Sequence, residues 1–384
     1  MANTLTNLIP DAYSALDVVS RELVGMIPAV TLDPDASRAA VGQTVRSFAA
    51  PSSSATDITP GVTAPNDGDQ TIANSSITIT KSRRVPFRWN GEEERGLNNG
   101  GPGVSNIRSD QIAQAMRTLT NEMEADLTFL SRNASRSYGD PAGVPFGTAG
   151  DYTDASFARK IIVDNGGPQS GLQMVINTGA GANIRGKQAD SNRQGTDSLL
   201  RQGVLLDTSG MMIRESAQIF NRTAGSGAGA TTSGTALSEG TLIIPLASAG
   251  TGGINTGDSI TFAGDPNQYV VKVGDSDVSN GGNLTIANPG LLQAIPASAT
   301  AITVVGSGFR NMVFARSAIV LATRSPALPE DGDSAVDRTL ITDPVSGITF
   351  ELAMYAQYRQ MQYELSAAWG VSAIKPEHMA LLLG

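Results

Sequence analysis

Cysteine is absent from all 384 residues, which excludes disulfide bridges and thiolate metal sites. Histidine occurs once, so any mechanism with a histidine base depends on His378. No stretch approaches the 18 apolar residues of a membrane span, and residues 1–13 lack the basic start and apolar run of a secretory signal. We therefore expect a protein that is made and kept in the cytosol, or in something assembled there, without membrane contact.

Aromatic residues (5%) and charged residues (16%) are also scarce, whereas glycine is abundant, at 42 residues. This balance favours β-structure, turns and long irregular connections over a helical bundle. A net charge of −9 argues against free DNA as the primary ligand, since duplex binding draws on clustered lysine and arginine. Only five of the 27 basic residues are lysines, and arginine is the cation enriched at protein interfaces, although genomic base composition produces the same bias. Other proteins are the expected partners.

Enzyme signatures are missing too: there is no Gly-x-Ser-x-Gly elbow, no His-Glu-x-x-His helix and no Walker lysine loop. We predict no enzyme, no cofactor and no metal. Gly179-Ala180-Gly181 follows an expected strand but lacks the third glycine of a dinucleotide loop, and a plain turn explains it. Asp275, Asp277 and Ser279 have the spacing of calcium ligands, but a β-turn in a Gly- and Asn-rich loop explains them equally well.

The most strongly patterned stretch is 109–132, where apolar residues recur at spacings of three and four and predict one helix of roughly 36 Å. Ser109 is expected to cap its first turn, and its charged residues, Glu124 among them, are expected on exposed sides. Two interpretations stay open, a core helix of an α/β enzyme and a structural beam. The stripe that forms the expected core consists of Ile112, Met116, Leu119, Met123, Leu127 and Leu130.

An extended arm precedes this helix. Residues 48–76 are rich in Ser, Thr, Pro, Asp and Gly and predict a long exposed loop, and residues 77–89 alternate strictly and predict one long strand, with Pro86 suggesting a sheet edge. Basic residues on the arm could contact nucleic acid, but the glutamates nearby favour salt bridges to another subunit. A run of three glutamates follows, more typical of a solvated stretch than of catalysis. The candidate intersubunit contacts are Lys81, Arg83, Arg84, Arg88, Trp89, Glu92, Glu93 and Glu94.

Elsewhere the patterns predict helices at 13–26 and 154–163 and a buried strand at 172–177. The sharpest change in composition spans 223–308, where charged residues almost disappear. Short β-strands between glycine-rich turns predict a small barrel or sandwich inserted into a host domain. The predicted strands are 241–247, 259–264, 268–274, 283–288 and 301–306.

Several phrases, considered together and in order, resemble the major capsid (coat) protein of tailed double-stranded-DNA bacteriophages, specifically the podovirus-type coat proteins that carry an inserted domain. The resemblance is strongest in residues 1–136 and weakest in the glycine-rich insertion. The phrases that carry it are residues 3–30, 41–46, 57–72, 77–101, 114–127 and 367–383.

The resemblance implies the α+β Hong-Kong-97-type capsid fold, with an N-terminal arm, an extended β loop, a long spine helix, peripheral and axial domains, and here an inserted small β-barrel. The corresponding ranges are 1–47 for the N-terminal arm, 48–90 for the β loop, 91–153 for the peripheral domain with the spine at 109–132, 154–222 for an axial or peripheral part, 223–308 for the insert, and 309–384 for the return and the C-terminal segment.

The implied function is a structural subunit of the virion that self-assembles into hexamers and pentamers of an icosahedral shell, first as a procapsid and then as an expanded mature shell. The implied partners are further copies of the chain, a scaffolding protein, the portal, and packaged DNA on the inner face without sequence specificity. Some relatives crosslink lysine to asparagine, which we do not predict here because only Lys81 lies near the arm. The alternative is a β-rich decoration or host-recognition protein, which predicts a compact trimer.

Overall fold

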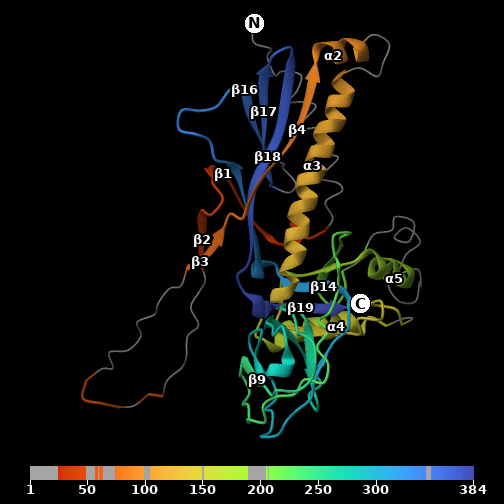
Figure 1. Ribbon diagram of the computed structural model, residues 1–384, viewed down its shortest axis with the longest axis vertical. Helices are drawn as coiled ribbons and strands as arrows, with labels where there is room; N and C mark the ends of the chain where they lie inside the picture. Colours follow the sequence, from red (N-terminus) through yellow and green to blue (C-terminus); the bar gives the residue numbers. More distant parts are fainter. Residues whose placement is uncertain are drawn as a thin grey trace.

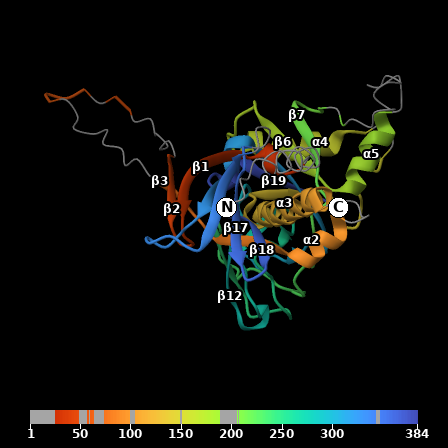
Figure 2. The same ribbon diagram turned by 90° about the horizontal axis from the view of Figure 1, so that it is seen from above.

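The computed structural model describes residues 25–48, 57–58, 60–63, 74–98, 104–148, 151–188, 205, 207–342 and 347–384. The molecule is elongated (Figure 1), and one long helix, α3, runs along its upper part beside a sheet of long strands. A second sheet and most of the remaining helices form the lower part, and a two-stranded ribbon leads away to one side (Figure 2). The mixture of helices and large sheets confirms the predicted α+β class.

The helix α3 comprises Val104–Phe129 and continues into a short 3-10 helix, η3 (Leu130–Asn133). It begins five residues before the predicted start, so Ser109 lies within the helix and not at its cap. The six residues of the predicted stripe are all buried. At 1.5 Å per residue, the 26 residues of α3 are about 39 Å long.

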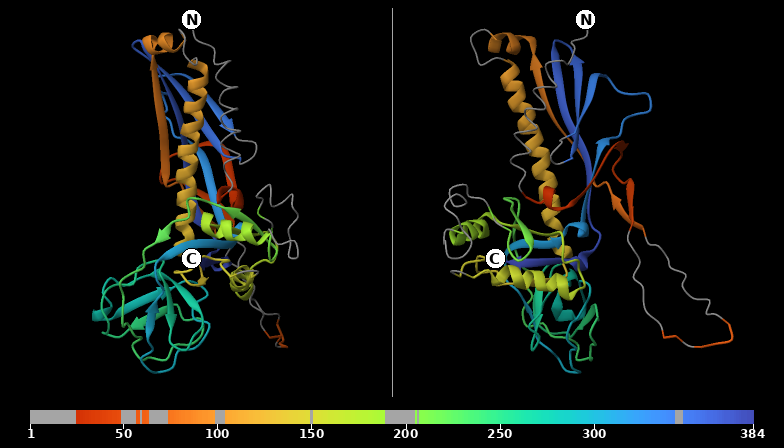
Figure 3. Two further views of the ribbon diagram at one scale, coloured as in Figure 1. Left: turned by 90° about the vertical axis from the view of Figure 1, so that its right-hand side faces the viewer. Right: turned by 180° about the vertical axis from the view of Figure 1, so that it is seen from behind.

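The upper sheet has six strands in the described part of the chain, and α3 packs against two of them, β4 and β18 (Figure 3). β15 and β17 pair with successive parts of β18, and β4 pairs along its other side. β1 joins β15 in parallel, and β16 joins β17. The strands are β1 (Thr31–Ala39), β4 (Lys81–Asn90), β15 (Ile319–Pro326), β16 (Ala335–Thr342), β17 (Thr349–Gln357) and β18 (Gln360–Ala373).

The predicted single strand over 77–89 is two strands, β3 (Asn74–Thr78) and β4. β3 pairs with β2 (Thr44–Phe48) in the ribbon, and the chain then changes partner at Ile79 and Thr80, where the Thr80 N–H donates to the Trp369 carbonyl. The predicted edge position of Pro86 is confirmed, because among the described strands β4 pairs with β18 alone.

The lower sheet has eleven strands among the described residues. Its host part centres on β14, which lies between β6 and β19, and β5 continues the sheet from β19 to β11. All five strands predicted within 223–308 are confirmed, as β9 to β13. The strands are β5 (Arg136–Tyr138), β6 (Leu172–Ile176), β7 (Met211–Glu215), β8 (Asn221–Arg222), β9 (Ile243–Leu246), β10 (Ser259–Phe262), β11 (Gln268–Val273), β12 (Gly282–Ile286), β13 (Ile302–Val304), β14 (Gly308–Ala315) and β19 (Met379–Leu383).

Three further α-helices are described. The helix predicted at 154–163 is confirmed as α4 (Thr153–Asp164). α5 (Thr178–Gln188) includes the glycines predicted as a plain turn, so that prediction was wrong, and α2 (Gly91–Asn98) contains the glutamate run, for which no helix was predicted. Most of the predicted helix at 13–26 and most of the predicted 48–76 loop lie outside the described residues. The 3-10 helices besides η3 are η2 (Ile27–Ala29), η4 (Val278–Asn280), η5 (Arg316–Ala318) and η6 (Pro376–His378).

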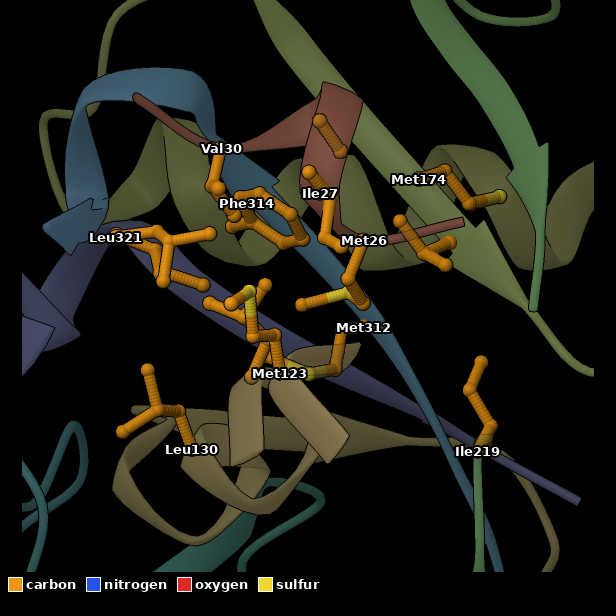
Figure 4. Packing of buried hydrophobic residues seen from close by; sticks show 14 of the residues in the cluster. Met26, Ile27, Val30, Met123, Leu130, Met174, Ile219, Met312, Phe314 and Leu321 are labelled. Carbon is orange, nitrogen blue, oxygen red and sulfur yellow. The ribbon is translucent and has the colours of Figure 1, made fainter. Parts of the chain in front are cut away.

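Two large hydrophobic clusters hold the structure together. The first spans both sheets of the host part, and η2 is built into it: Met26, Ile27 and Val30 pack among residues such as Met123 and Phe314 (Figure 4). The second lies wholly within residues 230–304. The insert therefore has a core of its own, while its strand β11 pairs with β5 of the host.

Candidate assembly surfaces

Lys81 is the centre of an ion-pair network that joins the edge strand β4 to the spine helix. Its Nζ lies 2.9 Å from Glu122 Oε1 and 2.8 Å from Asp126 Oδ1. The other oxygen of Asp126 accepts the Trp369 indole N–H at 2.9 Å, which adds β18 to the network. Burial opposes the charge of Lys81, but the hydrogen bonds to Asp126 and Glu122 outweigh it and raise the pKa of Lys81.

Two of the candidate arginines on β4 form ion pairs with glutamates on different elements, α3 and β18. Arg83 Nε lies 3.2 Å from Glu122 Oε1, and Arg84 Nη1 lies 2.6 Å from Glu364 Oε2 on β18. The hydrogen bond to Glu364 raises the pKa of Arg84. Arg88 is exposed on the same strand. Both ion pairs lie within one chain. Salt bridges from these arginines to another subunit therefore stay a prediction.

The far end of the upper sheet brings Trp89 and the glutamate run together. Asn90 and Glu93 cap α2 reciprocally: the Glu93 N–H donates to Asn90 Oδ1 at 2.8 Å, and the Asn90 N–H donates to Glu93 Oε2 at 3.1 Å. Trp89 Nε1 donates to Gln111 Oε1 of α3 at 2.8 Å. The run Glu92–Glu94 is thus the first turn of a helix, where negative charge is favoured by the helix dipole.

A cavity of about 710 Å³ opens beside α2, between Trp89 and the turn that joins β17 to β18. Tyr358, at that turn, is 86% exposed, and Arg359 has a φ of +54°, a conformation in which L-residues are uncommon. The Arg359 guanidinium lies 5.7 Å from the Tyr358 ring centroid. This end of the molecule therefore presents an exposed aromatic ring next to a hollow, features common at protein contacts.

Sequence patterning missed Glu124, which is buried on α3 although it was expected on an exposed side. Its two carboxylate oxygens accept the backbone N–H groups of Met26 at 2.6 Å and Ile27 at 3.2 Å. The carboxylate thereby attaches the segment at Met26 and Ile27 to the C-terminal part of the spine. The only signal in the sequence was its position directly after Met123 of the stripe, next to the apolar face.

The ribbon of β2 and β3 leads towards residues 57–63, whose described members lie far from the rest of the molecule (Figure 1). Ile58 is 96% exposed, and Val62 is fully exposed. An exposed branched side chain on its own is ordinary, but two of them at the end of a projecting arm contact no part of their own body. The described part of the arm thus holds two exposed apolar side chains away from the body of the subunit.

The two patterns considered for ligand binding form ordinary structure. Gly179 and Gly181 lie in the first turn of α5, where Asn177 Oδ1 accepts the Ala180 N–H at 2.9 Å. Asp275 and Asp277 accept N–H groups of their own loop. The described residues contain no group of three or more His, Cys, Asp and Glu side chains arranged to hold a metal. Burial lowers the pKa of His378, and Lys375 lowers it further, against Glu377.

No family model matches the sequence, and no curated protein matches it either. Solved structures do match. One is the capsid of the cyanophage P-SCSP1u, with 11% sequence identity and a TM-score of 0.46 over 92% of this chain and 86% of that chain. Another is a virus-like particle from Pyrococcus furiosus, with 10% identity and a TM-score of 0.44 over 97% of this chain and 98% of that chain. A structure from the Mycobacterium phage Che8 is a further match, with 10% identity and a TM-score of 0.42 over 90% of this chain and 85% of that chain.

None of the described helices is both long enough and apolar enough to cross a membrane. Three features lie at widely separated points of the described structure: the arm on one side, the exposed aromatic turn at the upper end, and the insert below (Figures 1 and 3). A long helix tied to the sheet by ion pairs connects the upper and lower parts.

Proposed function

We propose that this chain is the major capsid protein of a tailed double-stranded-DNA bacteriophage, a structural subunit that assembles with copies of itself into a closed shell. The observation that carries the proposal is the arm, with Ile58 and Val62 exposed far from the body of their own subunit. Burying those side chains in a neighbouring copy removes apolar surface from water, which is the dominant favourable contribution to most protein association.

The body of the subunit supports the same proposal. A shell must bear load across each subunit, and here a helix of 26 residues is fixed to the edge strand by Lys81 and to the N-terminal segment by Glu124. The Hong-Kong-97-type architecture that the sequence resembles has parts of this kind: an extended β loop, a spine helix and an inserted domain.

The finer parts of the proposal rest on that resemblance. Copies form hexamers and pentamers, a scaffolding protein directs a procapsid in the cytoplasm of the bacterial host, and the portal occupies one vertex. The shell then expands around packaged DNA and becomes part of the virion. The net charge of −9 argues against tight binding of that DNA by the subunit.

The test is to produce the full chain alone and with its scaffold, and to look for shells, tubes or sheets by negative-stain microscopy and sedimentation. The variant Ile58→Asp/Val62→Asp should keep the melting temperature of the free subunit and lose most assembly, because a charged tip cannot be buried in a neighbour. Val144→Asp, at a position 50% exposed on the body, is the matched control and should assemble normally. Normal assembly of the double variant, or only monomers and compact trimers from the wild type, would refute the proposal.

A further inference from the structure

The covalent connections between the insert and the host meet at a neck, which consists of β8, the start of β14 and Asp258. Arg222, the last residue of β8, lies opposite Gly308, the first residue of β14, in an antiparallel pair. The chain thus enters and leaves the insert, residues 223–307, at adjacent points. The pairing of β11 with β5 is a second attachment between the insert and the host.

Asp258 is completely buried and makes most of the side-chain hydrogen bonds at this neck. Arg222 donates to its Oδ1 from Nε at 3.3 Å and from Nη2 at 3.2 Å. Its Oδ2 accepts the backbone N–H groups of Gly225 at 3.0 Å and Asn255 at 2.7 Å. One carboxylate therefore holds the entering chain and a loop of the insert together.

Arg310, two residues after Gly308, is 2% exposed, and its three guanidinium nitrogens are buried without a hydrogen-bond partner among the described residues. Burial lowers the pKa of Arg310 to about 10, and so does Arg222, while Asp258 opposes them. At neutral pH the group therefore still carries its charge. A buried unpaired charge is among the most costly features of a folded protein.

The register brings the two arginines to one carboxylate. Since Arg222 lies opposite Gly308, Arg310 is its diagonal neighbour on the same face of the pair, at about 7–8 Å between backbones, within reach of long side chains. Both guanidinium groups interact electrostatically with the region of Asp258, but only Arg222 bonds to it in this structure. If Asp258 turns to Arg310, Arg222 keeps a hydrogen bond to the Thr256 carbonyl at 2.5 Å, and its side chain, 17% exposed, reaches water.

We propose that Asp258 exchanges between Arg222 and Arg310, so that this end of the insert has two arrangements, or seatings, while the pairing of β11 with β5 is kept. The seating in this structure satisfies Gly225 and Asn255 but leaves Arg310 unpaired. In the second seating, Asp258 pairs with Arg310 and loses some of its hydrogen bonds to Gly225 and Asn255. Each seating leaves a different group without its best partner, so both are populated where these two costs are similar.

A double-mutant cycle on free, full-length subunits tests this, whether or not the chain forms shells. Arg222→Met should lower the melting temperature only a little because Arg310 takes over Asp258, and Arg310→Met should leave it unchanged or raise it. The double variant should lose far more than the two single losses together, because Asp258 is then buried without a cation. Additive effects, or an Arg222→Met variant that is as unstable as the double variant or does not fold, would overturn the exchange.

Hydrogen exchange in the Arg310→Met variant gives a second, independent readout. Without the second seating, the Gly225 and Asn255 amides that donate to Asp258 should exchange more slowly than in the wild type. The Leu237 amide, which donates to Ile295 inside the insert, is the control for overall stability. Slowing at Gly225 and Asn255 beyond that of Leu237 supports two seatings, and equal slowing of all three contradicts them.

Discussion

The carboxylate of Glu124 accepts the backbone N–H group of Met26 at 2.6 Å, across 98 positions of sequence. It also accepts the N–H group of Ile27, so both donors at the start of η2 are satisfied by one side chain of the spine helix. N–H groups at the start of a helix have no partner within the helix, and buried ones must find another acceptor. Glu124 thus decides whether the segment before β1 stays in the core.

Glu124→Ala should lower the free energy of unfolding by roughly 2–6 kcal/mol, because two buried N–H groups lose their acceptor at about 1–3 kcal/mol each. Asn121→Ala, at an exposed position of the same helix, is the control and should change it by less than about 0.5 kcal/mol. Denaturant unfolding of the free subunit measures both. Similar losses in the two variants would mean that Glu124 has no anchoring role.

Gly25→Ala should detach the same segment by another route, since an added Cβ would collide with the Glu124 carboxylate and lie 2.8 Å from the Ser216 Cβ. Gly91→Ala is the matched control, because nothing lies within 4 Å of a Cβ there. Limited proteolysis should cut near Gly25 faster in the first variant only. Unchanged protection in Gly25→Ala would contradict this account.

Lys81→Met should cost about 1 kcal/mol at neutral pH, as expected for a partly exposed ion-pair network, and less in high salt. The folded state raises the pKa of Lys81, so its contribution is complete below the unfolded value of 10.5 and is lost as the pH rises through the higher folded value. The melting temperatures of wild type and variant, compared from pH 7 to 11, should converge only at the alkaline end. A constant difference over that range would show that charge is not responsible.

Leu119→Asp should abolish soluble subunit, because Leu119 is buried on the spine and an unpaired buried carboxylate costs several kcal/mol. Glu122→Gln changes one partly exposed partner of Lys81 and should cost no more than about 1 kcal/mol. Expression level and melting temperature distinguish the two variants. Comparable yields of folded protein from both variants would show that the stripe is not part of the core.

The segment 223–308, produced alone, should fold, because its cluster lies wholly within residues 230–304. It loses the pairing of Gln268 and Tyr269 with β5, so some fraying of β11 is expected. Amide NMR should give well-dispersed signals, with the broadest ones along β11. A collapsed spectrum would mean that the insert depends on its host.

Periodicity predicted the elements whose burial follows one simple pattern. The stripe from Ile112 to Leu130 and the five strands of the insert were of this kind, since alternation and helical spacing report directly which side faces a core. The change of partner at Ile79 could not be predicted, because strand alternation continues unchanged while the chain leaves β2 for β18. Nothing in a single strand's pattern names its neighbour.

Tertiary contacts explain the remaining errors. Three glycines in α5 argue against a helix by propensity, but Asn177 caps its start and Ala180 and Ile184 are buried. In α2, the signal was present as the Asn90 and Glu93 capping pair, which the glycines around it obscured. For the candidate site residues, the sequence showed which side chains are charged but not which groups they pair with. Arg84, for example, pairs with Glu364, which lies 280 positions further along the chain.

The adjacency of Arg222 and Gly308 has a consequence for how such a gene can change. Because the chain leaves the host sheet and returns to it at neighbouring positions, removing everything between them requires no more than a tight hairpin turn. Strand order and the other host pairings stay as they are. In evolution, a segment attached in this way behaves as a cassette that can be gained, lost or exchanged between lineages, while the sheet that carries it keeps its topology.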